Sequence, residues 1–150
     1  MKLSEFDKIT YEVNRGVALV TLNNPARRNA WGGRMSVEYR WALYHAHTDD
    51  SVRVVVVTGI GDDFCVGADT SELSTIESAG GAYQKAQLEL PPYPETAPEA
   101  FRRNHAYPWC IEKPVIAAVN GRCAGVGFIV ASYADLRFGA RNSVLKTAFS

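Results

Sequence analysis

The sequence predicts an α/β fold that forms one domain. Two apolar segments, residues 52–59 and 113–121, each end on a glycine, and each is followed by a glycine-bearing segment that opens a helix. Strand-like and helix-like patterns alternate along the chain with short turns, which is typical of α/β proteins. A length of 150 residues suits a single unit. We therefore expect one core domain over residues 1–150.

The N-terminal part predicts a hairpin, a loop and a helix. Alternating β-branched residues at 9–13 and 17–22 predict two paired strands. A proline ends the second strand, and residues 27–29 are expected to form an exposed loop. Residues 34–47 carry apolar side chains at helical spacing. The expected apolar face of this helix contains Val37, Trp41 and Tyr44, with Glu38 and Arg40 off that face.

The rest of the chain predicts short elements around two buried strands. Residues 54–57 and 115–119 are continuously apolar, and we expect residues 54–57 to be buried on both faces of a sheet. The prolines and glycines of residues 78–98 predict the most mobile segment. The remaining expected elements are helices at 100–109 and 125–133 and strands at 136–139 and 144–147.

Composition limits the possible partners. Sixteen basic residues balance sixteen acidic ones, which gives no electrostatic argument for binding nucleic acid or an anionic membrane. No apolar run approaches the roughly 20 residues that span a bilayer. The three widely spaced cysteines and the lack of a hydrophobic leader favour a cytoplasmic protein with structural thiols. No cluster has the spacing of metal ligands, so we expect no metal.

The paired glycine segments also indicate a type of chemistry. The first turn of a helix has backbone N–H groups without intrahelical partners, and it carries partial positive charge. Two such helix starts, brought together, would form a two-donor pocket for an oxyanion without using any side chain. This arrangement favours acyl chemistry.

Three segments together resemble the enoyl-CoA hydratase/isomerase (crotonase) superfamily. They are residues 17–30, which contain Arg28-Asn29-Ala30, residues 63–69 and residues 124–128. The resemblance implies a crotonase-like spiral of β-β-α turns, an acyl-CoA thioester as ligand, and coenzyme A as part of the substrate instead of a separate cofactor. It also implies a homo-oligomer, since relatives build trimers through helices that lie beyond the equivalent of residue 150.

The resemblance assigns roles to individual residues. The backbone amides of Val66 and Val126 would donate to the thioester oxygen, and Arg28 and Ala30 would lie beside the adenine and phosphates of coenzyme A. Asp69 could cap a helix or meet the ligand, and we favour the capping role. The other positions expected to line the substrate are Gly67, Ala68, Gly125, Gly127 and Ile129.

The sequence departs from the family where protons would move. Hydratases of the family carry two glutamates, and the corresponding positions here are Ile129 and Phe149. Hydration needs a base to activate water and an acid to protonate carbon, and neither side chain can serve. Hydratase activity is therefore doubtful. The alternative is a non-catalytic or vestigial fragment that binds coenzyme A esters and needs a partner or a missing C-terminal half, because relatives continue beyond residue 150.

Overall fold

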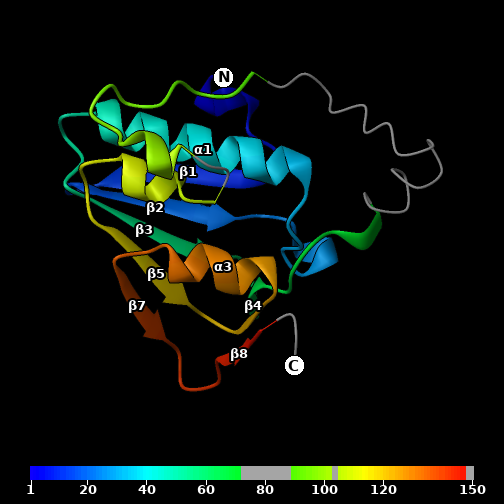
Figure 1. Cartoon of the computed structure of the whole chain (residues 1–150). Helices are drawn as coiled ribbons and strands as arrows, with labels where there is room; N and C mark the ends of the chain where they lie inside the picture. The colour runs from blue at the N-terminus through cyan, green and yellow to red at the C-terminus, as the bar shows by residue number, and fades with distance from the viewer. Residues whose placement is uncertain (72–88, 103–104, 148–150) are drawn as a thin grey trace.

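The computed structural model describes residues 1–71, 89–102 and 105–147, and these form two β-sheets with helices packed against them (Figure 1). The larger sheet has five strands in the order β1-β2-β3-β5-β7, and the smaller has three in the order β4-β6-β8. The larger sheet contains β1 (Ile9–Asn14), β2 (Val17–Leu22), β3 (Val54–Gly59), β5 (Val115–Val119) and β7 (Leu136–Gly139). The smaller contains β4 (Asp63–Cys65), β6 (Arg122–Ala124) and β8 (Val144–Lys146).

The chain builds both sheets together as a spiral. It passes from β3 to β4, from β5 to β6 and from β7 to β8, so each turn adds one strand to each sheet. After β6, helix α3 (Val126–Ser132) completes a turn and packs on β4 and β6. Within each sheet the hydrogen-bonded neighbours are parallel, except that β1 pairs antiparallel with β2. The predicted α/β spiral of β-β-α turns is confirmed.

The N-terminal hairpin closes through a two-residue turn. Asn14 lies opposite Val17, and the intervening Arg15 and Gly16 have φ of 50° and 82°. Positive φ at both turn residues is what a type I′ turn requires, and this turn matches the twist of the strands that it joins. The hairpin predicted for this segment is therefore confirmed.

Helix α1 (Gly33–Thr48) lies against β1 and β2 (Figure 1), but its buried side differs from the prediction. Val37 is buried as predicted, but Trp41 and Tyr44 are only partly buried, whereas Glu38 and Arg40 are buried. The helix is covered on more than one side, because the short 3-10 helix Tyr107–Cys110 also contacts it. The principal core residues of α1 are Met35, Tyr39, Ala42, Leu43 and Ala46.

The central strands are covered fully on one face only. Val55 and Val57 are almost completely buried, while Val54 and Val56 are partly exposed. The same alternation occurs along β5. The expectation that residues 54–57 are buried on both faces is wrong, because the second face of this sheet is only partly covered by the described elements.

Two predictions for the middle of the chain have different outcomes. In place of one helix over residues 100–109, the described residues form two 3-10 helices, Glu99–Phe101 and Tyr107–Cys110. Pro108 lies in the first turn of the second helix, where a missing N–H costs nothing, and it cannot continue an earlier helix. Residues 89–98 contain no helix or strand, and most of the segment expected to be mobile (78–88) lies outside the described residues.

The last two strands expose apolar side chains. Strand β7 is exposed at all four positions and β8 at all three. The large apolar residues among them are Leu136, Phe138, Val144 and Leu145. Single exposed apolar residues are ordinary, but large apolar side chains exposed on the edge strand of each sheet make β7 and β8 candidates for an interaction surface.

Asn29 is buried, although residues 27–29 were predicted to be exposed. Its side-chain amide donates to the carbonyls of Ile60 (3.0 Å) and Asp63 (2.7 Å), and its oxygen accepts the N–H of Asn24 (3.0 Å). Its φ of 56° is one that asparagine tolerates better than most residues. The side chain therefore joins the loop after β2 to the turn between β3 and β4.

We expect Asn29→Ala to lower the free energy of unfolding by about 2–4 kcal/mol, since it removes three hydrogen bonds, one of them the buried bond to the Asp63 carbonyl. Urea unfolding followed by circular dichroism measures this. The matched control is Asn14→Ala, which removes an exposed asparagine from β1. Equal, small effects of the two substitutions would contradict this role for Asn29.

Candidate functional site

The two glycine-bearing loops lie at the ends of neighbouring strands. Strands β4 and β6 are parallel, with Cys65 opposite Cys123, and the loops follow directly. Val66 and Val126 are partly buried, and within the described residues neither backbone N–H has a hydrogen-bond partner. Two unpaired amide donors on adjoining loops are what an oxyanion pocket needs.

Two of the site glycines are explained by backbone conformation. Gly67 has φ of 115° and Gly125 has φ of 52°, and side chains rarely occupy this region. The loops also approach closely, because a Cβ on Gly125 would lie 3.5 Å from the Cα of Gly67. Since 3.5 Å is an ordinary contact distance, the positive φ, and not lack of space, is what favours glycine at these two positions.

Gly127 has a packing role. A Cβ at this position would lie 2.7 Å from the Cβ of Cys65 and would also collide with the Cys65 carbonyl oxygen. Only glycine lets the first turn of α3 sit this close to β4. The resemblance placed Gly127 beside the substrate, and the structure gives it a contact within the protein.

Backbone hydrogen bonds join the loop after β2 to the first glycine loop. The N–H of Trp31 donates to Gly67 (2.7 Å), and the N–H of Asp69 donates to the carbonyl of Trp31 (3.0 Å), so that Trp31 and Ala68 form a parallel bridge. Ala30 is buried beside this bridge, whereas Ala68 is exposed. We call this the Trp31–Ala68 bridge. It fixes the predicted coenzyme A loop to the predicted oxyanion loop.

Asp69 caps the helical turn that begins at Thr70. Its carboxylate accepts the hydroxyl (2.6 Å) and the N–H (3.0 Å) of Ser71, and it pairs with Arg27 at 2.9 Å. The hydrogen bond from the Ser71 hydroxyl is the largest cause that lowers the pKa of Asp69. The geometry agrees with the favoured capping role.

Arg28 is engaged within the protein. Its guanidinium donates to both carboxylate oxygens of Asp63, at 2.9 and 3.1 Å, and Arg122 approaches the same carboxylate at 3.4 Å. The hydrogen bond from Arg28 is the main cause that lowers the pKa of Asp63. A paired guanidinium offers fewer free donors to a phosphate than the sequence suggested for Arg28.

A cavity of about 200 Å³ lies beside this loop and carries three basic side chains. Lys8, Arg27 and Arg34 come from three separate segments, and Asp69 is the only acidic residue among the described lining residues. The remaining lining residues are Asn24, Ala30, Gly32, Met35 and Ser71. Sequence reasoning missed Lys8, Arg27 and Arg34 as a group, because only the fold brings them together. We call this the basic cavity.

The cysteines are buried and free. Burial raises the pKa of Cys65 to about 11 and that of Cys123 to about 12, so both thiols stay protonated near neutral pH. A protonated, buried thiol is a poor nucleophile. In the part of the chain that the structure describes, no cluster of His, Cys, Asp and Glu could hold a metal ion, and no helix is long and apolar enough to cross a bilayer.

Neither of the two positions that correspond to the proton-transferring glutamates of hydratases carries a carboxylate. Ile129 lies on α3 with 39% of its surface exposed, and Phe149 lies outside the described residues. The imidazole ring of His105 lies 6.3 Å from the ring of Trp31, which belongs to the bridge. Burial, followed by the charge of Arg40, lowers the pKa of His105 and so favours its neutral form.

The spiral and its paired loops define a crotonase fold, and the chain belongs to the enoyl-CoA hydratase/isomerase family, whose model matches residues 12–150. A probable enoyl-CoA hydratase of Mycobacterium tuberculosis is 35% identical over 147 residues, which are 98% of this chain and 52% of that protein. The 1,2-epoxyphenylacetyl-CoA isomerase of Escherichia coli K12 is 33% identical over 95% of this chain and 51% of its own length.

A solved structure agrees with this assignment. The enoyl-CoA hydratase/carnithine racemase of Magnetospirillum magneticum superposes with a TM-score of 0.76 at 29% identity, covering 94% of this chain and 49% of that one. The chain thus spans about half the length of the curated relatives that it matches.

We expect Gly127→Ala to lower the free energy of unfolding by about 1–3 kcal/mol, because the added methyl group would push α3 away from β4. Thermal unfolding followed by circular dichroism measures the loss. Ile129→Ala on the same helix is the control, and it should change stability by less than about 1 kcal/mol because Ile129 is partly exposed. A larger loss at 129 than at 127 would show that the close approach to Cys65 is not what fixes α3.

Proposed function

We propose that this protein binds an acyl-CoA thioester and polarises its carbonyl group. The observation that carries the proposal is the pair of unpartnered amides at Val66 and Val126, on loops that touch through Gly67 and Gly125. A thioester oxygen that accepts both N–H groups gains negative charge in the transition state. Removing one such donor from an enzyme typically costs about 3–4 kcal/mol in the barrier.

The basic cavity is the proposed site for phosphate groups of coenzyme A. Its volume of about 200 Å³ is smaller than the roughly 300–1,000 Å³ of pockets that enclose a whole ligand, so it would hold part of an extended one. Arg27 donates to Asp69 through one terminal nitrogen, and a guanidinium has further N–H groups for a phosphate. The cavity shares Asp69 with the loop that carries Val66, which suits a ligand reaching from one to the other.

The proposed chemistry is stabilisation of an enolate-like oxyanion. Which reaction follows depends on the groups that transfer protons to and from the substrate. The position of Ile129 supplies no proton, which disfavours hydration. Isomerisation, decarboxylation or C–C cleavage uses the same oxyanion, and one relative of this chain is named as an acyl-CoA isomerase. The second candidate function is binding without turnover, supported by the same apolar side chain at 129.

A panel of acyl-CoA esters tests these alternatives. We expect coenzyme A esters to bind and crotonyl-CoA to show almost no hydration, because Ile129 and Phe149 cannot transfer a proton. Ile129→Glu alone should not restore activity, since the second carboxylate is still absent. Steady hydration near about 10 s⁻¹, the rate of an ordinary enzyme, would contradict the proposed chemistry. Absence of binding to any ester, with the fold intact, would contradict the proposed ligand.

We also propose that the protein self-associates through β7 and β8. The support is the exposure of Leu136 and Phe138 on β7 and of Val144 and Leu145 on β8. Light scattering with an intact-mass check should give a molar mass above 16.5 kDa for this chain. Replacing Phe138 and Leu145 by serine should then shift the distribution towards the monomer. A monodisperse, thermally stable monomer before substitution would be evidence against this surface.

A further inference from the structure

We propose that Glu38 is a positioning residue for the basic cavity, and that its buried carboxylate fixes two of the three cations that face the ligand. The inference rests on the proposed function only for the identity of the ligand, the phosphate groups of coenzyme A. Glu38 itself does not line the cavity. It acts through Lys8 and Arg34, which do.

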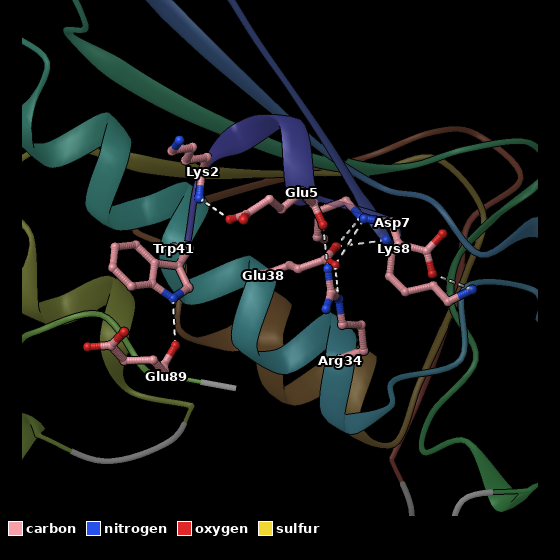
Figure 2. Close-up of polar contacts among 9 residues, drawn as sticks. Lys2, Glu5, Asp7, Lys8, Arg34, Glu38, Trp41 and Glu89 are labelled. Carbon is pink, nitrogen blue, oxygen red and sulfur yellow. Dashed lines mark hydrogen bonds and ion pairs between the residues drawn. The ribbon is translucent and has the colours of Figure 1, made fainter. Parts of the chain in front are cut away.

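Glu38 holds the backbone around Lys8. Its side chain is fully buried, and its carboxylate accepts the N–H groups of Asp7 (2.9 Å), Lys8 (2.7 Å) and Ile9 (2.9 Å). Figure 2 shows this carboxylate on α1 pointing into the curve of the chain that precedes β1. Three consecutive amides donate to one carboxylate, which leaves this backbone segment little freedom. The position of the Lys8 Cα, from which its side chain extends, is therefore fixed.

The same carboxylate orients Arg34. The Nε of Arg34 forms an ion pair with Glu38, and a terminal nitrogen donates to the Glu5 carbonyl (Figure 2). A guanidinium is a rigid fork, so fixing two of its nitrogens sets the direction of the remaining N–H groups. One acidic side chain therefore orients the Arg34 guanidinium directly and fixes the backbone from which Lys8 extends, while the Lys8 ammonium itself pairs with Asp7 at 3.3 Å.

The sign of the effect separates positioning from simple electrostatics. Through space, the negative charge of Glu38 opposes an anion in the cavity, so removal of this charge alone would strengthen phosphate binding. If Glu38 acts by holding Lys8 and Arg34 in place, its removal weakens binding, because both cations must then be ordered by the ligand. The two readings predict opposite changes in affinity.

The test measures binding of inorganic pyrophosphate and of coenzyme A by isothermal titration calorimetry. We expect Glu38→Gln to weaken both by about tenfold, the lower end of the loss seen when groups that orient metal-binding side chains are removed. Glu12→Gln is the matched control, because it removes the same charge from an exposed position on β1. Unchanged or tighter binding by folded Glu38→Gln would overturn the proposal.

A double-mutant cycle adds a readout that a merely structural role would not move. The loss caused by Arg34→Met should shrink in the Glu38→Gln background, since the two residues form one unit. The loss caused by Arg27→Met should be the same in both backgrounds, because Arg27 is held by Asp69. Equal coupling of Glu38 to Arg27 and to Arg34 would overturn the proposal.

Amide hydrogen exchange of the unaltered protein covers the case in which Glu38→Gln does not fold. Because coupling is reciprocal, bound pyrophosphate should slow exchange at the amides of residues 7–9. Normal binding with unchanged exchange at these amides would overturn the role of Glu38. If the protein binds pyrophosphate but not coenzyme A, the role of Glu38 stands and the proposed function is contradicted. If it binds neither, both the role of Glu38 and the proposed function are contradicted.

Discussion

The short crossings between the two sheets are the constraint on which the rest of the structure depends. The chain leaves β3 at Gly59 and enters β4 at Asp63, and it leaves β5 at Val119 and enters β6 at Arg122. Such tight crossings force backbones into contact: a Cβ on Gly121 would lie 2.7 Å from the carbonyl carbon of Asp62. Asn120 joins the crossings by accepting the N–H of Gly59 (3.1 Å) and donating to the carbonyl of Gly61 (2.8 Å). Because the crossings are fixed, the loops after β4 and β6 emerge together.

Local pattern predicted the elements well and their environment less well. The hairpin, helix α1, the central strands and the glycine loops follow from periodicity and turn residues, which are local properties. The predicted face of α1 was right at Val37 but wrong in leaving out Glu38, which is buried by partners from a different segment, the amides of residues 7–9. Asn29 was placed at the surface for the same reason: the carbonyls that satisfy it lie more than thirty residues away.

The candidate site shows a similar division. Val66 and Val126 could be named from the sequence because their loops carry recognisable glycines. The cations of the basic cavity could not, because Lys8, Arg27 and Arg34 share no motif and meet only when the segment before β1 lies along α1. Arg28 shows the reverse case, in which a residue chosen by its place in a motif is occupied by Asp63. Charge alone does not reveal that Arg28 uses two N–H groups on Asp63, whereas Arg27 uses one on Asp69.

The Trp31–Ala68 bridge makes the two loops that it joins one cooperative unit. Its hydrogen bonds connect the segment beside the basic cavity to the segment that carries the Val66 amide. Local opening of either loop must break bonds that also hold the other, so the two segments fluctuate together. In the proposed function, contacts with the distant end of a ligand would therefore also steady the amide that meets its reacting carbonyl, which is how remote binding energy can lower a barrier.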